Sequence, residues 1–353
     1  MASPIIKLIV NGREYTDIIQ IEVEKDIDYI SGSFSCVVAN NFMSNFPIRV
    51  NDKVTVNIAG NDVIYGNVET LDDDIDTRSH SVTITGRDVT ADLVRSEIYS
   101  NADYSFTDLK SLIEAVMKDN GITNIGVIDE SNSEGNDFSE GESQVGETGQ
   151  TIFDFISDYA DKASKVLTSD GKGNVVIYSN SGINKSVVLN NSYDNENRYI
   201  KNINYSIDFN DRYKRVIVKS QAEDLSSGGE DITAESIDDE VVRNITKVII
   251  SDTVSDKETA QRLADFEVNK RRSDSISYSC TVPSFFNISR IFWEPNLLVA
   301  IIDSNTGVNA TMLLKGITYK YNLEEGSTSD LVFVSEDTYS LKTQASQFNE
   351  GVQ

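Results

Sequence analysis

Histidine and cysteine are nearly absent from this sequence of 353 residues, which contains one histidine, His80, and two cysteines, Cys36 and Cys280. Their scarcity excludes most histidine-based acid–base machinery, zinc sites built from cysteine and histidine, and any dense disulfide framework. Both cysteines fall on the apolar face of alternating strands, so we expect buried structural thiols. His80 stands between two serines without a nucleophile motif nearby, so we expect a surface or turn histidine.

Long apolar runs are also missing. No segment reaches the length of about 20 apolar residues that a membrane helix needs, and residues 1–10 lack the basic start and long apolar centre of a signal peptide. Proline (4) and glycine (20) are not in excess, and 39% of the residues are hydrophobic. We therefore expect a folded protein that is made in a cytoplasm, does not insert into a membrane and divides into two or three domains.

Positive charge is scarce relative to negative charge. The chain has 31 Lys and Arg against 57 Asp and Glu, which gives a net charge of -26. A protein that binds nucleic acid gains most of its affinity by placing cations on phosphates, and an anionic membrane surface attracts basic segments. The charge balance therefore argues against both kinds of binding.

Period-two alternation dominates residues 1–98, where Ile19, Ile21 and Val23 share one face of a run and Val82 and Ile84 share one face of another. Alternation interrupted by turn residues is typical of a half-buried antiparallel sheet. Strands are predicted near residues 5–10, 18–25, 33–39, 53–58, 63–70 and 80–86. So many short strands in under 100 residues favour a small barrel or sandwich.

Helical periodicity appears in residues 99–185, which we predict to form a small α/β domain. The apolar spacing predicts helices over about 107–120, with Thr107 as its cap, and 150–164. Residues 165–169 and 174–178 flank Asp170–Gly173, whose glycines suit the tight turn of a β-hairpin.

Residues 186–340 return to alternating strands, with a helix at about 256–272 that starts at the capping box Ser255–Glu258. We predict a second barrel here, interrupted by an insertion at about 222–275, and a polar tail at 341–353. The predicted fold class is mainly β with α+β parts: two similar small antiparallel β-barrels of the tail-tube type plus an inserted α/β domain.

A weak internal repeat supports the two-barrel prediction. Tyr65–Asp88 can be laid without a gap on Leu314–Asp337, which matches three apolar pairs: Val68 with Ile317, Val82 with Leu331, and Ile84 with Phe333. The pattern of Ile19–Val23 followed by Phe34–Val38 resembles that of Ile203–Ile207 followed by Val216–Val218. The similarity is one of strand order and spacing rather than of residue identity.

Several segments invite a chemical interpretation that their patterns do not support. Asp72–Asp76 lacks the glycine and terminal glutamate of a calcium loop, so we interpret it as a solvated turn. Gly121–Gly126 and Asp170–Gly173 lack the features of a phosphate loop. Lys270–Arg272 ends a helix, where cations meet the negative end of the dipole; an ion pair with a neighbouring acidic subunit is the alternative.

Acidic residues are too numerous to identify a catalytic pair. With 57 carboxylates, some pair will always have a glycosidase-like separation. The two most acidic stretches, Asp129–Glu147 and Glu223–Glu240, are expected to be mobile surface loops. We assign no catalytic, cofactor-binding or metal-binding residue and expect no cofactor.

Five segments in order resemble a known family. Gly86–Val94 follows a Tyr65–Val68 strand and an Asp-rich hairpin, and the later segments are Glu147–Asp154, Leu167–Asn174, Phe209–Tyr213 and Phe292–Val299. Over about residues 5–335, their order and spacing resemble the phage Mu-type baseplate hub family of contractile tails. The resemblance implies structural turns at Gly86, Arg87, Asp88, Trp293 and Pro295.

The resemblance also implies a function without catalysis. Hubs of this family are homotrimers in which each chain carries two tube-like barrels, so that three chains adapt a sixfold tail tube to a threefold central spike. It implies a location in the virion baseplate after assembly in the host cytoplasm, with the tube protein, the spike protein and other baseplate proteins as partners. DNA would pass through the lumen without specific binding, and acidic residues on the lumen wall would not retain it.

Two other functions remain open at this point. The first is a tail-associated peptidoglycan hydrolase that uses two carboxylates. The second is a receptor-binding or glycan-binding module at the tail tip, although the single tryptophan, Trp293, lies in an apolar run that suits sugar stacking poorly.

Overall fold

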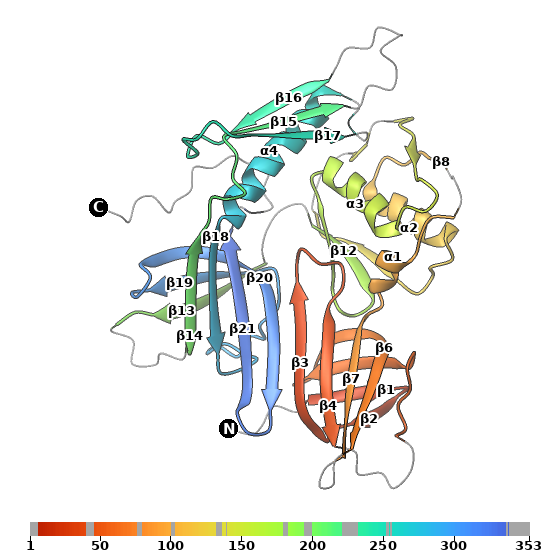
Figure 1. The fold of residues 1–353 in the computed structure, drawn as a ribbon, viewed down its shortest axis with the longest axis vertical. Coiled ribbons are helices and arrows are strands. Elements are labelled where there is room, and N and C mark those ends of the chain that lie inside the picture. The colour runs from red at the N-terminus through yellow and green to blue at the C-terminus, as the bar shows by residue number, and fades with distance from the viewer. Residues whose placement is uncertain are drawn as a thin grey trace.

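The computed structural model describes residues 6–338 apart from 40–45, 76–79, 100–102, 132–135, 139, 179–182, 194–199, 221–231, 252–253, 255 and 337. Its dominant feature is one sheet of thirteen strands that runs through both halves of the chain. Figure 1 shows the first half of this sheet in red and orange, the second half in blue with β13 and β14 in green, and the remaining units beyond one end of the strands. The predicted polar tail at 341–353 lies outside the described residues.

The N-terminal half of the sheet has the spatial order β3-β4-β7-β6-β5-β1-β2, with every neighbouring pair antiparallel. Its strands are β1 (Ile6–Val10), β2 (Arg13–Tyr15), β3 (Ile18–Asp26), β4 (Ser33–Ala39), β5 (Lys53–Ile58), β6 (Asn61–Ile75) and β7 (His80–Asp88). The predicted strands are confirmed, because alternating apolar residues face the core. One boundary was wrong: β6 continues to Ile75, so Asp72, Asp73 and Asp74 lie on a strand and not in a turn.

The C-terminal half has the order β13-β19-β20-β21-β18-β14, in which β13 alone pairs in parallel. Its strands are β13 (Ile183–Asn191), β14 (Asn202–Ile207), β18 (Ile276–Val282), β19 (Leu297–Asp303), β20 (Val308–Asn322) and β21 (Gly326–Ser335). Apolar residues of both halves join one hydrophobic core. The halves meet where β3 pairs antiparallel with β20, from Asp26 opposite Gly316 to Gln20 opposite Asn322.

The same antiparallel order occurs twice, as β5-β6-β7-β4-β3 and as β19-β20-β21-β18-β14. The long strand of each half carries a β-bulge against its hairpin partner, between Val68 and Thr70 in β6 and between Leu314 and Gly316 in β20. Two residues from the bulge along the same hairpin, Ile84 pairs with Cys36 and Leu331 pairs with Cys280. The two buried cysteines therefore occupy equivalent positions.

This register corrects two details of the sequence comparison. Val68 corresponds to Leu314, Ile84 to Leu331 and Val82 to Ser329, so all three matched pairs of the ungapped alignment are two or three residues out of register. The counterpart of Phe34–Val38 is β18 and not Val216–Val218. The described strands form one open sheet, so closure of two separate barrels is not confirmed.

The segment between the halves builds an α/β unit with its own core. Its elements are α1 (Ala91–Arg95), β8 (Asp103–Tyr104), α2 (Leu109–Asp119), β9 (Gly126–Asp129), β10 (Gln144–Val145), α3 (Ile152–Lys162), β11 (Val166–Ser169) and β12 (Asn174–Tyr178). The predicted helices and hairpin are confirmed. The cap of α2 is Asp108 rather than Thr107, since the Asp108 carboxylate accepts the Ser111 N–H at 2.8 Å.

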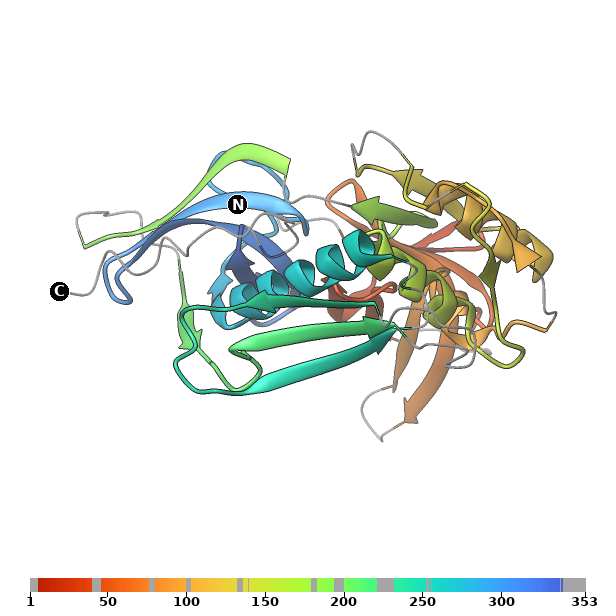
Figure 2. The same ribbon diagram turned by 90° about the horizontal axis from the view of Figure 1, so that it is seen from above.

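A second small unit interrupts the C-terminal half. It consists of a sheet in the order β16-β15-β17 and one helix, made of β15 (Arg215–Ser220), β16 (Thr233–Ile237), β17 (Thr246–Ser251) and α4 (Lys257–Asp274). Figure 2 shows α4 lying across this sheet. Asp256 caps α4 by accepting the Thr259 N–H, whereas Ser255 of the predicted capping box lies outside the described residues.

The acidic stretches are not simply mobile loops, and that prediction was wrong for their described parts. In the first, Asp137 lies 2.8 Å from Lys165 Nζ and Glu142 pairs with Lys162, because both lysines are buried and need carboxylate partners. In the second, residues 233–237 form β16.

Candidate functional site

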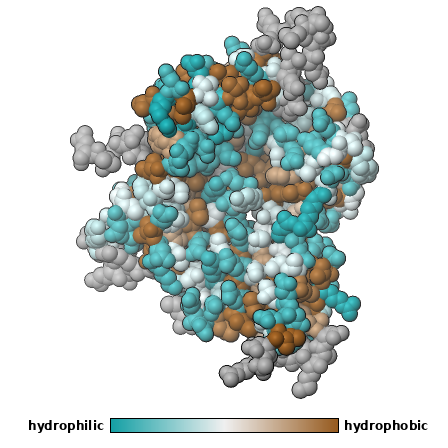
Figure 3. Space-filling model, in the orientation of Figure 1, coloured by the Kyte–Doolittle hydropathy of each residue, from teal (hydrophilic) through white to brown (hydrophobic). Residues whose placement is uncertain are grey.

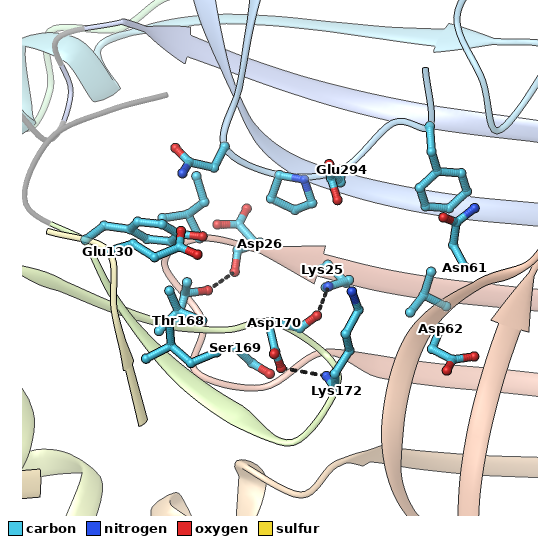
Figure 4. A pocket seen from close by; sticks show the side chains of 18 of the residues that line it. Lys25, Asp26, Asn61, Asp62, Glu130, Thr168, Ser169, Asp170, Lys172 and Glu294 are labelled. Carbon is cyan, nitrogen blue, oxygen red and sulfur yellow. Dashed lines mark hydrogen bonds between the residues drawn. The ribbon is translucent and has the colours of Figure 1, made fainter. Parts of the chain in front are cut away.

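A cavity of about 590 Å³ lies where the two halves of the sheet meet the α/β unit. Its walls come from the end of β3, the turn before β6, the β11–β12 hairpin and the loop before β19, and Figure 4 shows their side chains around it. We call it the junction cavity. Its lining side chains come from both halves of the sheet and from the α/β unit, so contacts among them help to hold these three parts together.

Lys25 and Lys172 are the cations that line the junction cavity, and Lys25 is the one buried in it. Its Nζ donates to the main-chain oxygen of Asp170 at 2.9 Å, which ties β3 to the tip of the β11–β12 hairpin. Burial lowers the pKa of Lys25, while the negative charges of Asp88 and Asp170 act in the opposite direction. A lysine at the inward position after Ile21 and Val23 breaks the alternating pattern, and this is the signal that sequence analysis missed.

The hairpin tip is shaped by the turn that the sequence predicted. The Asp170 carboxylate accepts the backbone N–H groups of Lys172 at 2.6 Å and Asn174 at 3.1 Å. Gly171 has a φ of +72°, and a Cβ at this position would lie 2.1 Å from the Val63 carbonyl oxygen. Only glycine allows the hairpin to approach β6 so closely.

Acidic and basic side chains gather on the other side of the β3–β20 joint. Lys315 Nζ lies 2.5 Å from Asp28 and 3.9 Å from Asp274, and Lys270 Nζ also lies 3.9 Å from Asp28. Burial raises the pKa of the neighbouring Asp26 to about 6. These contacts connect β3, β20 and α4, so they join the small unit to the sheet.

The chemistry of this region is that of a joint. Lys25, Lys270 and Lys315 are each engaged with a carboxylate or a main-chain oxygen, as is usual for charges that stabilise packed elements. Among the described residues, no group of three or more His, Cys, Asp and Glu side chains could hold a metal ion. None of the described helices is long and apolar enough to cross a membrane.

The prediction of a turn at Gly86, Arg87 and Asp88 was wrong, because all three residues lie at the end of strand β7. Buried Asp88 accepts the N–H of Gly32 at 3.0 Å and that of Thr90 at 3.0 Å. Arg87 donates to Glu69 at 3.2 Å. A Cβ on Gly86 would lie 2.2 Å from the Asn67 carbonyl oxygen, so this strand also depends on glycine.

The predicted turn residues of the second half lie beside the junction cavity. Trp293 is fully buried, and its carbonyl oxygen accepts a hydrogen bond from the Tyr319 hydroxyl. Pro295 lines the cavity wall. The structure therefore brings Trp293 and Pro295 to the joint, while Gly86, Arg87 and Asp88 lie along β7.

The two cysteines, His80 and the basic cluster at 270–272 all make contacts that stabilise the fold. Cys36 and Cys280 are buried, and burial raises the thiol pKa of both, that of Cys280 to about 12. His80 lies on β7 within 2.5 Å of the Asp73 carboxylate. At the end of α4, Arg271 pairs with Glu267 and Arg272 with Asp238, so side chains as well as the helix dipole hold this cluster.

Comparison with known proteins identifies relatives across the chain. Residues 5–88 match the family model described as "Mu phage baseplate assembly protein GpP-like, N-terminal". The chain is 24% identical over 343 residues to baseplate hub protein gp44 of Escherichia phage Mu, covering 91% of this chain and 85% of that protein. The predicted resemblance to Mu-type baseplate hub proteins is confirmed.

Solved structures show the same fold. The 43 kDa tail protein of prophage MuSo2 from Shewanella oneidensis has a TM-score of 0.79 at 24% identity, covering 95% of this chain and 99% of that one. A tail protein from Neisseria meningitidis MC58 has a TM-score of 0.81 at 18% identity, covering 96% and 98%. The type VI secretion component c3393 of E. coli, described as similar to T4 tail proteins gp27 and gp5, has a TM-score of 0.62 at 10% identity, covering 96% and 79%.

Proposed function

We propose that this chain, whose sequence and fold are those of a Mu-type baseplate hub protein, is the trimeric hub of a contractile phage tail. Its relatives support a structural role in a tail baseplate. The observation that carries the finer proposal is the strand order that occurs twice in one chain. Three copies would present six such units, which matches a sixfold tube on one side and a threefold spike on the other.

A continuous polar face of the sheet supports the second part of the proposal, a conduit for DNA. The polar face consists of the outward residues of eight adjacent strands, among them Asn204, Ser279, Asp330, Lys320, Glu22, Ser35, Thr85 and Asp72. The surface over β3, β4, β20 and β21 is mostly teal and white in Figure 3. Hydroxyl and carboxylate groups cannot replace the counterions of a polyanion, so such a wall would let DNA pass without holding it.

The partners in this proposal are the tail tube protein, the central spike protein and other baseplate proteins, and the site of action is the virion baseplate. The division into a first tube-like domain (1–98), an α/β domain (99–185) and a second tube-like domain (186–340) with an insertion at about 222–275 is part of the proposal. The junction cavity then lies where these parts must stay aligned while the tail contracts.

The alternative functions lack a comparable observation. The relatives reported above are named as tail, baseplate and secretion-system proteins. A glycan-binding module would stack sugars on exposed aromatic side chains; the single tryptophan, Trp293, is fully buried, and the exposed Tyr29, Tyr99 and Tyr193 lie in three separate segments of the chain.

Light scattering of the purified protein across a concentration series tests the proposal. A stable particle of three times the chain mass of 39.1 kDa is the expected result. A monomer at every concentration would contradict a self-assembling trimer, and release of soluble fragments from purified cell wall would support the hydrolase instead.

A further inference from the structure

The small sheet of β15, β16 and β17 has one face that α4 covers and one that stays exposed. Helix α4 packs against the face that carries Val218 and Ala234. The opposite face, which we call the outer face, carries Ile237, Val248 and Ile250, which are 46%, 48% and 68% exposed. Brown side chains over the small sheet near the top of Figure 3 show this apolar surface. Exposed aliphatic side chains that gather on one face point to a surface that a partner covers.

Strand β17 forms one edge of the small sheet. Among the described strands it pairs only with β15, in parallel and without a break in register over all of its 6 residues. Every one of these residues is exposed or half-buried. Such an edge presents unpaired N–H and C=O groups that can receive a further strand. Because Val248 and Ile250 lie on β17 itself, a strand added there would also cover part of the outer face.

The charge along β17 is opposite in sign to that of the whole chain. Residues 241–251 contain Arg243 and Lys247 and no Asp or Glu, although acidic residues outnumber basic ones by 57 to 31 in the sequence. Among the residues that the structure describes, neither of these two cations has a carboxylate partner. On β16, by contrast, Glu235 is already paired with Arg215 at 3.0 Å. The β17 edge therefore offers uncompensated positive charge to a partner strand.

These charges favour one kind of partner. Two copies of β17 placed edge to edge would bring the same cations together, and like charges across a strand pair are destabilising. An acidic strand is favoured instead, because its carboxylates can lie beside Lys247 on one face of the sheet. On the other face, its apolar side chains can lie beside Val248 and Ile250. The pattern that fits this edge is therefore an alternation of acidic and apolar residues.

We infer that the β17 edge binds an extended segment of another protein, in which acidic and apolar residues alternate, as an additional strand of the small sheet. In this mode of recognition, main-chain hydrogen bonds supply affinity and alternate side chains supply specificity. The inference goes beyond the proposed hub function and does not rest on it, since it uses only residues of the small unit. It makes the inserted unit an attachment point for a partner protein.

Binding of synthetic peptides to the full-length protein tests the inference. The probe is a fluorescein-labelled peptide of about eight residues in which glutamate and valine alternate, and the matched probe has lysine in place of glutamate. Nonspecific attraction to a chain with a net charge of -26 favours the lysine peptide. Fluorescence anisotropy should nevertheless show the glutamate peptide binding roughly tenfold more tightly, with an affinity that falls as salt rises. Equal binding, or tighter binding of the lysine peptide, would overturn the inference.

A charge reversal locates the site. Lys247→Glu should weaken binding of the glutamate peptide roughly tenfold, because it places like charges side by side. The matched control is Lys201→Glu, which changes the total charge equally at an exposed lysine just before β14 of the large sheet. Since Lys247 is only half-exposed, Arg243→Glu at an exposed position serves as a second variant and should act in the same direction. Affinities that are unchanged in both, or that fall equally in the control, would contradict a site at β17.

Methylation of the peptide backbone tests whether a strand is added. Successive N–H groups of an extended strand point to opposite edges, so methylating alternate amides of the glutamate peptide blocks one edge only. Of the two alternately methylated peptides, one should lose binding and the other should keep it, and binding by both would refute strand addition. Light scattering of Lys247→Glu separates this contact from self-association. An unchanged particle mass is expected, whereas a lower mass would show that β17 joins copies of this chain and would overturn the inference.

Discussion

Buried charges hold together the small unit of β15–β17 and α4, where Arg212 before β15, Asp238 after β16 and Arg272 of α4 meet. Arg212 and Asp238 are almost fully buried, and the guanidinium donates to this carboxylate at 2.7–3.0 Å. Arg272 adds a further contact to Asp238 at 3.1 Å. Truncating one member of such a pair leaves an uncompensated charge in the interior, which costs far more than losing a surface ion pair.

Asp238→Ala should therefore lower the free energy of unfolding by about 3–5 kcal/mol. Asp239→Ala, at the adjacent residue, removes an exposed carboxylate that lies 3.2 Å from Lys214 and should change stability by less than about 1 kcal/mol. Urea unfolding followed by tryptophan fluorescence would measure both. Similar losses for the two variants would show that burial does not set the strength of this pair.

The joint residue Asp26 should make stability depend on pH. Burial raises its pKa from 3.8 to about 6 in the folded protein, so its contribution is fully present below about pH 4 and is lost as pH rises through 6. Asp26→Asn keeps an oxygen to accept the Asp28 N–H but removes this titration. Relative to the wild type, the variant should gain on the order of 1–2 kcal/mol between pH 4.5 and pH 7.5.

Unfolding curves at the two pH values would measure this gain. Glu24→Gln is the control, since Glu24 is exposed on the same strand. If the difference between Asp26→Asn and the wild type is the same at both pH values, the carboxyl group does not titrate in this range.

At the scale of elements, the tip of the β11–β12 hairpin packs closely against the first half of the sheet. The approach of Gly171 to Val63 leaves no room for a side chain. Gly121, which follows α2, has a similar φ of +77°, but a Cβ there would meet nothing within 4 Å. Substitutions at the two glycines therefore distinguish the cost of a strained backbone from the cost of a steric clash.

Gly121→Ala should cost about 1 kcal/mol, the strain of a left-handed backbone alone. Gly171→Ala should cost about 2–4 kcal/mol, because the hairpin must also move away from β6. Thermal and urea unfolding would measure the two costs. Equal costs would mean that the hairpin shifts freely and does not brace the joint.

At the scale of the whole molecule, part of the net charge of -26 lies on the polar face of the sheet. Glu22 and Glu24 are exposed on β3 at the centre of the polar face. If this face lines the conduit, its charge determines whether DNA is retained there.

Glu22→Lys combined with Glu24→Lys should convert a trimer that does not bind DNA into one that does, with affinity falling steeply as salt rises. Asp239→Lys combined with Glu258→Lys changes the total charge equally but places it on the small unit, and it should bind DNA much more weakly. Fluorescence anisotropy with a labelled duplex at several salt concentrations would measure this. Equal binding by both variants would contradict a lumen position for the polar face.

The sequence by itself determined most of the strands of the large sheet, the main helices and the resemblance to a hub protein. Alternating apolar residues predict strands because side chains on a strand point to opposite faces in turn, and this local rule needs no knowledge of the partner strand. The same rule located the two buried cysteines. It also identified Asp170–Gly173 as a turn, since the conformations that glycine allows are local properties.

Only the tertiary structure decided which strands meet. In the second half β14 pairs with β18, which follows only after the small unit, so β18 and not Val216–Val218 is the counterpart of β4. The junction cavity likewise brings Lys25, Asp170 and Pro295 together from three separate segments. Strand partners and buried ion pairs depend on long-range packing, whereas strand and turn propensities depend on neighbours in sequence, and this difference separates what could be predicted from what had to be observed.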